Sequence, residues 1–245
     1  MKVWGITDTG LVRKDNQDAY DFDLKVETGN TVCVVCDGMG GTAGGQLASQ
    51  IAVRTYMQEM RRVLEKGMSP ERLREASSYA VSLANRAVRE EAEKSPDCRN
   101  MGTTLVSAVS YAGGAVVSNV GDSRAYLITP DGITRITKDH SLVESMVDRG
   151  DITAEEARRH PNKNLITRAL GPDVNAICDG YITPMSAGDY LLLCTDGLID
   201  TVTDQEMLFE VIHGEEPNTC LQRMMAISKS RGAADNVTAV LMQKQ

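Results

Sequence analysis

Aspartates stand at the ends of several strand-like apolar runs, and together these side chains are suited to binding a metal ion. The runs and their aspartates are Val32 to Asp37, Val116 to Asp122, Tyr190 to Asp196, and Ala233 to Asp235 two residues before Val237. Mg²⁺ and Mn²⁺ prefer oxygen ligands, and strand ends hold such ligands rigidly. Four such aspartates, far apart in sequence, predict a convergent metal site.

Two of these aspartates are followed by glycine, at Gly38 and Gly197. A residue without a Cβ lets its backbone carbonyl approach an ion closely, so Gly38 is a candidate carbonyl ligand. The alternative is four independent hairpin turns, because an Asp-Gly pair is also common turn chemistry. The residues alone leave both interpretations open.

A charged segment near the N-terminus adds two more candidates. Asp18 begins a strand-like run, and Arg13 lies five residues before it. The guanidinium of arginine is permanently charged and suits bidentate binding of phosphate. The alternative for a stretch of this composition is a solvated loop of mixed charge.

The elements that must position these side chains are short strands interrupted by helices. Strands are predicted over residues 3–7, 19–24, 31–36, 103–110, 115–120, 124–129, 133–137, 176–183, 189–194 and 237–242, with a turn at 27–30. Helices are predicted over 46–66, from the Ser69-Pro70 start to about 94, from a capping box at 203–206, and over 218–231. Residues 141–170 break the pattern with two short helices. Residues 1–245 are therefore expected to form a single α+β domain, with antiparallel strands and outer helices.

Composition limits the partners and the compartment. Apolar residues make up 42% of the chain and charged residues 24%, as in an ordinary globular protein. The net charge of −8 disfavours nucleic acid and anionic membranes, which bind clustered Lys and Arg. The sequence has no signal-peptide pattern and no long apolar run, so we expect a cytoplasmic protein. Cys33 and Cys36 form a CxxC, but residues three apart on a strand face opposite ways, which argues against zinc or redox chemistry.

Short motifs along the whole chain resemble those of metal-dependent serine/threonine phosphatases of the protein phosphatase 2C type, in their bacterial form. They are TDTGLVRKDNQDAY (7–20), VCDGMGG (35–41), MGTT (101–104), NVGDSRAY (119–126), DHSLV (139–143), HPNKNLITRALG (160–171), CTDGL (194–198) and DNVT (235–238). They occur in the order typical of the family. The set is therefore specific, although each motif is weak on its own.

The resemblance implies an αββα sandwich of two antiparallel sheets, with a site at one end for two Mn²⁺ or Mg²⁺ ions and a weaker third ion. The implied roles are Asp37 bridging both main ions, Asp196 and Asp235 on the first, the Gly38 carbonyl and Asp18 on the second, Asp122 with Asp196 on the third, and Arg13 on the phosphoryl oxygens. The implied reaction is direct attack of a metal-bridging water on phosphoserine or phosphothreonine, without a phosphoenzyme.

The resemblance also implies partners. Phosphorylated proteins are the expected substrates, a cognate bacterial serine/threonine kinase is the expected antagonist, and the expected state is a monomer. Residues 141–170 correspond to a flap beside the site that varies in the family and is expected to select substrates. The alternative is a surface loop without that role.

Two positions depart from the pattern of animal members of the family. Met39 stands where they carry a histidine thought to protonate the leaving group, and Gln17 stands where they carry a glutamate. No general acid is identified from the sequence, and a metal-bound water is the expected proton source. His140 is interpreted as a local hydrogen-bond partner, and His160 and His213 as structural or surface residues.

Three other function classes fit parts of the pattern. A regulatory pseudophosphatase would keep the fold without the chemistry, but all the expected acidic residues and Arg13 are present. A two-metal nuclease or nucleotide hydrolase would also use carboxylates, but the chain has no basic stripe. A structural calcium site is the third class, and no EF-hand loop is present.

Overall fold

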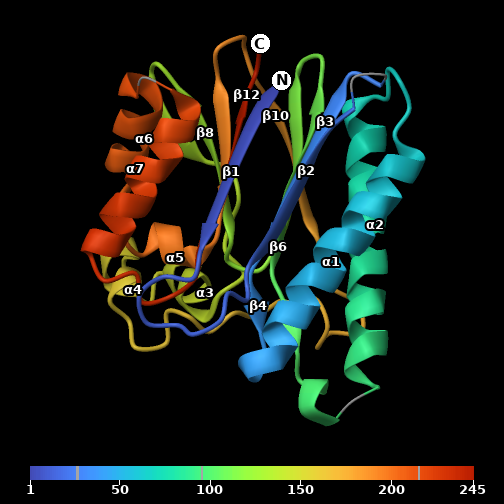
Figure 1. The fold of residues 1–245 in the computed structure, drawn as a ribbon, viewed down its shortest axis with the longest axis vertical. Coiled ribbons are helices and arrows are strands. Elements are labelled where there is room, and N and C mark those ends of the chain that lie inside the picture. Colours follow the sequence, from blue (N-terminus) through green and yellow to red (C-terminus); the bar gives the residue numbers. More distant parts are fainter. Residues whose placement is uncertain (26–27, 95, 215) are drawn as a thin grey trace.

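The computed structural model describes residues 1–25, 28–94, 96–214 and 216–245, which form a four-layer αββα sandwich (Figure 1). One sheet has the strand order β1-β12-β11-β8-β9 and the other β10-β7-β6-β3-β2, with antiparallel pairing throughout. The strands are β1 (Lys2–Asp8), β2 (Ala19–Lys25), β3 (Asn30–Cys36), β6 (Leu105–Tyr111), β7 (Gly114–Val120), β8 (Arg124–Thr129), β9 (Gly132–Arg135), β10 (Asp179–Pro184), β11 (Tyr190–Cys194) and β12 (Val237–Gln243). A small separate sheet pairs β4 (Gly38–Met39) with β5 (Gly102–Thr103). The predicted fold class is confirmed.

Helices cover the outer face of each sheet. The long helices α1 (Gly41–Val63) and α2 (Pro70–Ala92) lie on the second sheet, and α6 (Asp204–His213) and α7 (Pro217–Ser230) lie on the first (Figure 1). Two helix start signals that the sequence predicts are confirmed. Ser69 accepts a hydrogen bond from the Arg72 N–H at the start of α2, and Thr203 with Glu206 forms a capping box at the start of α6.

Three hydrophobic clusters hold the four layers together. One lies between the sheets and includes Cys33 and Val240, and one on each outer side joins a sheet to its pair of helices. Cys36 belongs to the cluster beneath α1 and α2, so the two cysteines of the CxxC do face opposite ways. Burial raises the pKa of both thiols, as expected for inert core cysteines.

A few boundaries differ from the prediction. Helix α1 begins at Gly41 rather than residue 46, although glycine disfavours helix, because Gly44 and Gly45 allow close contact with Met101 and with the Gly38 backbone. Strand β10 begins three residues later than predicted, and a 3₁₀ turn occupies Pro96–Cys98 between α2 and β5. The predicted turn at 27–30 lies partly outside the described residues.

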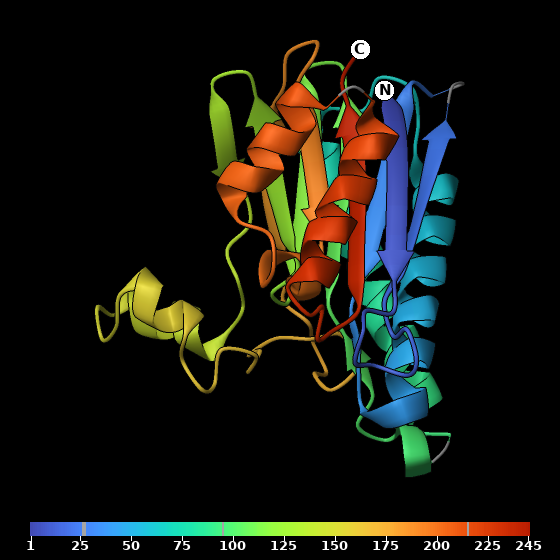
Figure 2. The same cartoon turned by 60° about the vertical axis from the view of Figure 1, so that its left-hand side comes forward.

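Residues 141–170 leave the sandwich and carry two short helices, α3 (Leu142–Asp148) and α4 (Ala154–Arg158). Figure 2 shows this segment, in yellow, projecting away from the sheets toward the end opposite the two termini. A capping box between Thr153 and Glu156 starts α4. The segment returns to the body where Leu170 forms a bridge with Thr103.

Candidate active site and metal centre

Strand register brings the predicted aspartates to one end of the sandwich. Ala19 pairs with Cys36, so the residues just outside that pair, Asp18 and Asp37, lie side by side at the strand ends. In the other sheet, Cys194 at the end of β11 pairs with Arg124, the first residue of β8, and with Ala239 near the start of β12. The loops that carry Asp122, Asp196 and Asp235 therefore leave the sheet at this same end.

The aspartate side chains also influence one another electrostatically. Burial, with the nearby charges of Asp196 and Asp235, raises the pKa of Asp18 to about 7. Burial, with the charges of Asp235 and Asp200, raises the pKa of Asp196 to about 6. Buried carboxylates that repel one another stay ionised together only when a cation neutralises them.

The pKa values of Asp37 and Asp122 are also raised well above the ordinary value of aspartate. Burial is the main cause for both Asp37 and Asp122, and neighbouring aspartates contribute to each. Asp37 is influenced by the charges of all four of the other carboxylates, as expected for a ligand shared between ions.

The donor set fits a hard divalent cation. Asp18 Oδ1 and Asp196 Oδ1 are buried and accept no hydrogen bond from the described residues. A buried carboxylate oxygen without a donor is costly unless a cation satisfies it. Within the described ranges, no group of three or more Asp, Glu, His or Cys side chains is arranged so that these side chains alone could hold a metal ion. Mg²⁺ and Mn²⁺ do not require such a group, because they retain several water ligands.

Hydrogen bonds fix the backbone that carries Asp37. The Asp37 N–H donates to Thr104 Oγ1 at 2.9 Å, and the Asp37 carbonyl accepts from the Thr104 N–H and from Thr103 Oγ1. Thr104 Oγ1 also lies 2.7 Å from the hydroxyl of Ser123, the residue after Asp122. The MGTT motif thus links the loops of two candidate ligands, a role that the sequence analysis did not assign.

Thr195 holds Asp18 from the opposite sheet. Its buried hydroxyl donates to Asp18 Oδ2 at 2.9 Å and accepts from the Thr238 N–H at 3.0 Å. The sequence analysis missed Thr195 as a site residue. Its position directly before Asp196, inside an otherwise apolar stretch, was the available signal.

Arg13 reaches the site through a long-range ion pair. Its guanidinium lies 2.7 Å from Asp235 Oδ2 and the side chain is about half exposed. The loop that carries Arg13 is held by Asn236, whose amide donates to the carbonyls of Thr9 and Asp15 and accepts from the Gln17 N–H. Asn236 was also missed, although it lies in the DNVT motif.

The two Asp-Gly glycines are required by close backbone contacts. A Cβ at Gly38 would overlap the Gly45 carbonyl, and a Cβ at Gly197 would overlap the Asn236 carbonyl. The structure places Gly38 directly after Asp37 in the short strand β4, where it is buried. Its proximity to the carboxylates suits the predicted carbonyl ligand.

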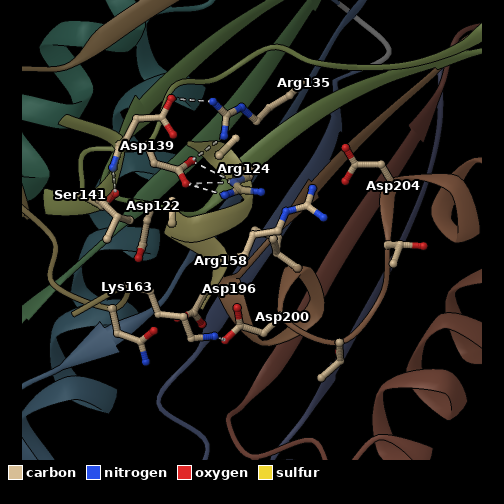
Figure 3. Close-up of a pocket in the computed structure, with 18 of the residues that line it drawn as sticks. Asp122, Arg124, Arg135, Asp139, Ser141, Arg158, Lys163, Asp196, Asp200 and Asp204 are labelled. Carbon is tan, nitrogen blue, oxygen red and sulfur yellow. Dashed lines mark hydrogen bonds and ion pairs between the residues drawn. The ribbon is translucent and has the colours of Figure 1, made fainter. Parts of the chain in front are cut away.

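An open pocket of about 580 Å³ leads to part of this centre (Figure 3). Asp122 and Asp196 line it, whereas Asp18, Asp37 and Asp235 do not. Arg158 and Lys163 from the 141–170 segment also line it, and Lys163 Nζ lies 2.6 Å from Asp200 Oδ2. The projecting segment therefore borders the approach to the aspartates.

Met39 and the three histidines lie in different surroundings. Met39 is half-buried in β4, and His213 is exposed at the end of α6. His160 Nδ1 accepts a local hydrogen bond from the Asn162 N–H. His140 is buried and hydrogen-bonded on both ring nitrogens. His140 is therefore a hydrogen-bond partner, as interpreted, but its partners Gly121 and Asp179 are 19 and 39 positions away and are not local.

Comparison with known proteins finds a family to which this chain is similar. The family model for protein phosphatase 2C matches residues 12–242. The chain is 34% identical to serine/threonine phosphatase stp of Listeria innocua, covering 97% of this chain and 94% of that protein. It is 37% identical to serine/threonine protein phosphatase PstP of Mycobacterium tuberculosis, covering 96% of this chain but 43% of that longer protein.

Solved structures agree with these sequence matches. The crystal structure of serine/threonine phosphatase Stp1 from Staphylococcus aureus superposes with a TM-score of 0.92 at 33% identity, covering 100% of this chain and 95% of that one. The catalytic domain of PstP in complex with two manganese ions gives a TM-score of 0.83 at 33% identity, covering 98% and 96%. No helix in the described ranges is long and apolar enough to cross a membrane.

Proposed function

The chain is a serine/threonine phosphatase of the protein phosphatase 2C family, and we propose that it is metal-dependent and hydrolyses phosphoserine and phosphothreonine in proteins. The observation that carries the metal dependence is the group of buried, mutually repelling aspartates with unpaired oxygens on Asp18 and Asp196. The relative solved with two manganese ions supports the same proposal. The ion could be Mn²⁺ or Mg²⁺, since both favour oxygen ligands.

We assign the aspartates to ions as the resemblance to the family implies. Asp37, which is influenced by the other four carboxylates, would be shared by two ions. The remaining proposed ligands are Asp196 and Asp235 for the first ion, Asp18 and the Gly38 carbonyl for the second, and Asp122 with Asp196 for a third. Thr104 and Thr195 keep the Asp37 backbone and the Asp18 carboxylate in place.

The proposed reaction is a direct hydrolysis without a phosphoenzyme. The bound ions would supply Lewis-acid activation of a bridging water and neutralise charge on the phosphoryl group. Arg13 would bind the phosphoryl oxygens, because its ion pair with Asp235 holds a half-exposed guanidinium beside the aspartates. Such fixed positive charge favours the phosphoryl-transfer transition state.

The leaving oxygen needs a proton, and we propose that water supplies it. Met39 has no proton to give. Both ring nitrogens of His140 already have hydrogen-bonding partners. His213 lies on α6, away from the loops that carry the aspartates.

Partners and location follow as proposals. We expect phosphoproteins as substrates, a serine/threonine kinase as the antagonist, and a monomeric state. All six cysteines are free thiols, which supports a reducing compartment such as the cytoplasm. We propose that residues 141–170 act as a flap of a single catalytic domain and select substrates, since Arg158 and Lys163 border the pocket.

The test is hydrolysis of p-nitrophenyl phosphate and of a phosphothreonine peptide in Mn²⁺, in Mg²⁺ and in excess chelator. The wild type is compared with Asp37→Ala and with Asp131→Ala, which removes an exposed aspartate in the β8–β9 turn. We expect turnover only with metal, lost in Asp37→Ala and kept in Asp131→Ala. Folded, metal-loaded wild type without turnover would contradict the proposal and favour a regulatory binding module.

A further inference from the structure

His140 occupies a buried junction directly behind the turn that carries Asp122. Its side chain is 6% exposed. The Gly121 N–H donates to His140 Nδ1 at 3.1 Å, and the His140 N–H donates to the Gly121 carbonyl at 2.9 Å. Both polar groups of the Gly121 peptide backbone are thus bonded to one residue, and Asp122 follows directly.

The Gly121 turn needs this support because its backbone conformation is unusual. Gly121 has a φ of +105°, and a Cβ there would overlap the side chain of Thr104. The Gly121 carbonyl also accepts from Asn119 Nδ2 at 3.2 Å. The direction in which Asp122 leaves β7 therefore depends on a small set of hydrogen bonds, two of them from His140.

The other ring nitrogen determines the protonation form of His140. His140 Nε2 lies 3.1 Å from Asp179 Oδ2 and 3.1 Å from Arg168 NH1, which itself donates to Asp179 Oδ1. Nδ1 must keep its lone pair to accept from the Gly121 N–H. A neutral ring then carries its proton on Nε2, where Asp179 is the acceptor. In this form Arg168 NH1, which can only donate, bonds to Asp179 Oδ1 and not to Nε2.

The other ring forms conflict with these contacts. A proton on Nδ1, in the second neutral tautomer or in the cation, would face the Gly121 N–H and break that bond. The second tautomer would also point the Nε2 lone pair at the Asp179 carboxylate. The charged groups near the ring are Asp179, Arg168 and Asp139, and only the Nε2–H form satisfies both Gly121 and Asp179.

We propose that His140, held as the Nε2–H tautomer by Asp179, is a positioning residue that sets the Gly121 turn and so the direction of the Asp122 carboxylate. It acts through the backbone and does not touch the reacting atoms. The importance of this position for metal binding rests on the proposed role of Asp122. The hydrogen bonds and the tautomer do not depend on that role.

The first experiment is ring ¹⁵N NMR of the wild-type chain without metal. The chain has three histidines, and loss of one set of signals in His140→Asn assigns this ring. We expect His140 to show a protonated Nε2 and an unprotonated Nδ1 from pH 6 to 8. A protonated Nδ1 would overturn the proposal, and no variant has to fold for the wild-type spectrum to be recorded.

The second experiment compares two substitutions that each keep one half of the ring. The amide oxygen of His140→Asn lies near the position of Nδ1 and can still accept from Gly121. The amide nitrogen of His140→Gln lies near the position of Nε2 and can still donate to Asp179. We expect Gly121 N–H exchange without metal to stay near wild type in the first and to become roughly five- to tenfold faster in the second.

Activity then connects the turn to the metal. His140→Gln should need several-fold more Mn²⁺ for half-maximal turnover of p-nitrophenyl phosphate, with His140→Asn nearer to wild type and His213→Asn unchanged. A role in packing alone predicts the reverse order, because glutamine is closer in size to histidine. Equal Gly121 exchange and equal Mn²⁺ requirement in the two His140 variants would overturn the proposal. If the protein were not a phosphatase, the NMR and exchange results would still test it.

Discussion

The Arg13 guanidinium lies 2.7 Å from Asp235 Oδ2, although 222 positions separate the two residues in the chain. The pair joins the N-terminal loop to the turn before β12. A guanidinium has five N–H donors, so a bond to Asp235 leaves donors for a phosphoryl group. Asp235 thereby orients the residue proposed to bind the substrate phosphate.

Replacing Arg13 with alanine should therefore weaken catalysis without unfolding the protein. Hydrogen bonds to a charged group contribute about 1.5–3 kcal/mol each, so we expect kcat/KM to fall roughly 10- to 150-fold. The measurement is steady-state hydrolysis of p-nitrophenyl phosphate in saturating Mn²⁺. Lys14→Ala removes the same charge one residue away and should change kcat/KM little. Equal effects of the two substitutions would contradict a specific role for Arg13.

Thr195→Val should weaken both the fold and the metal site. The substitution leaves the Thr238 N–H without its acceptor and removes the donor to Asp18, at a cost of about 1–3 kcal/mol in the free energy of unfolding. Ser77→Ala is the matched control, because that buried hydroxyl lies 2.7 Å from those of Tyr56 and Ser118, among α1, α2 and β7. Denaturant unfolding and Mn²⁺ titration by calorimetry measure the two effects. If Ser77→Ala weakened Mn²⁺ binding as much as Thr195→Val, the specific contact to Asp18 would not be the cause.

The sequence can place the aspartates at strand ends because that signal is local. Each one ends or precedes an apolar run, and alternation along a strand needs no knowledge of distant residues. The partners of these aspartates are different. The bond between Asp18 and Thr195 spans 177 positions and exists because of how the two sheets pack, which no local pattern encodes. The early start of α1 has the same origin, since close packing overrides the low helix propensity of Gly44 and Gly45.

Gly197→Ala should damage the metal site by steric overlap. The new Cβ would collide with the Asn236 carbonyl, so either α5 (Asp196–Ile199) or the loop that carries Asp235 must move. We expect a loss of about 1–3 kcal/mol in the free energy of unfolding and weaker Mn²⁺ binding. Gly188→Ala is the control, because that position is open but has a φ of +94°, which costs an alanine about 1–2 kcal/mol. If both variants lose similar stability but only Gly197→Ala loses Mn²⁺ affinity, the placement of Asp196 is supported. If the two variants bind Mn²⁺ equally well, that placement is contradicted.

The stability of the metal-free protein should fall as the pH rises from 5 to 7.5. Burial raises the pKa of Asp18 to about 7 and that of Asp196 to about 6. In an unfolded chain the pKa of an aspartate is about 3.9. Between these values the folded state binds more protons than the unfolded state, so the free energy of unfolding decreases with increasing pH. The thermal midpoint in chelator should drop over this range, and Asp18→Asn should reduce the drop.

Added Mn²⁺ should oppose that loss, because the ion binds the ionised carboxylates and competes with protons. At a free concentration of about 100 times Kd, a ligand adds about 2.7 kcal/mol to the free energy of unfolding. For a chain of this size that corresponds to a rise of about 5–10 °C in the thermal midpoint. The rise should be larger at pH 7.5 than at pH 5, where protonation of Asp18 and Asp196 weakens binding. A thermal midpoint that stays level with pH in chelator, or a Mn²⁺ effect that is greatest at pH 5, would show that these aspartates do not form the metal site.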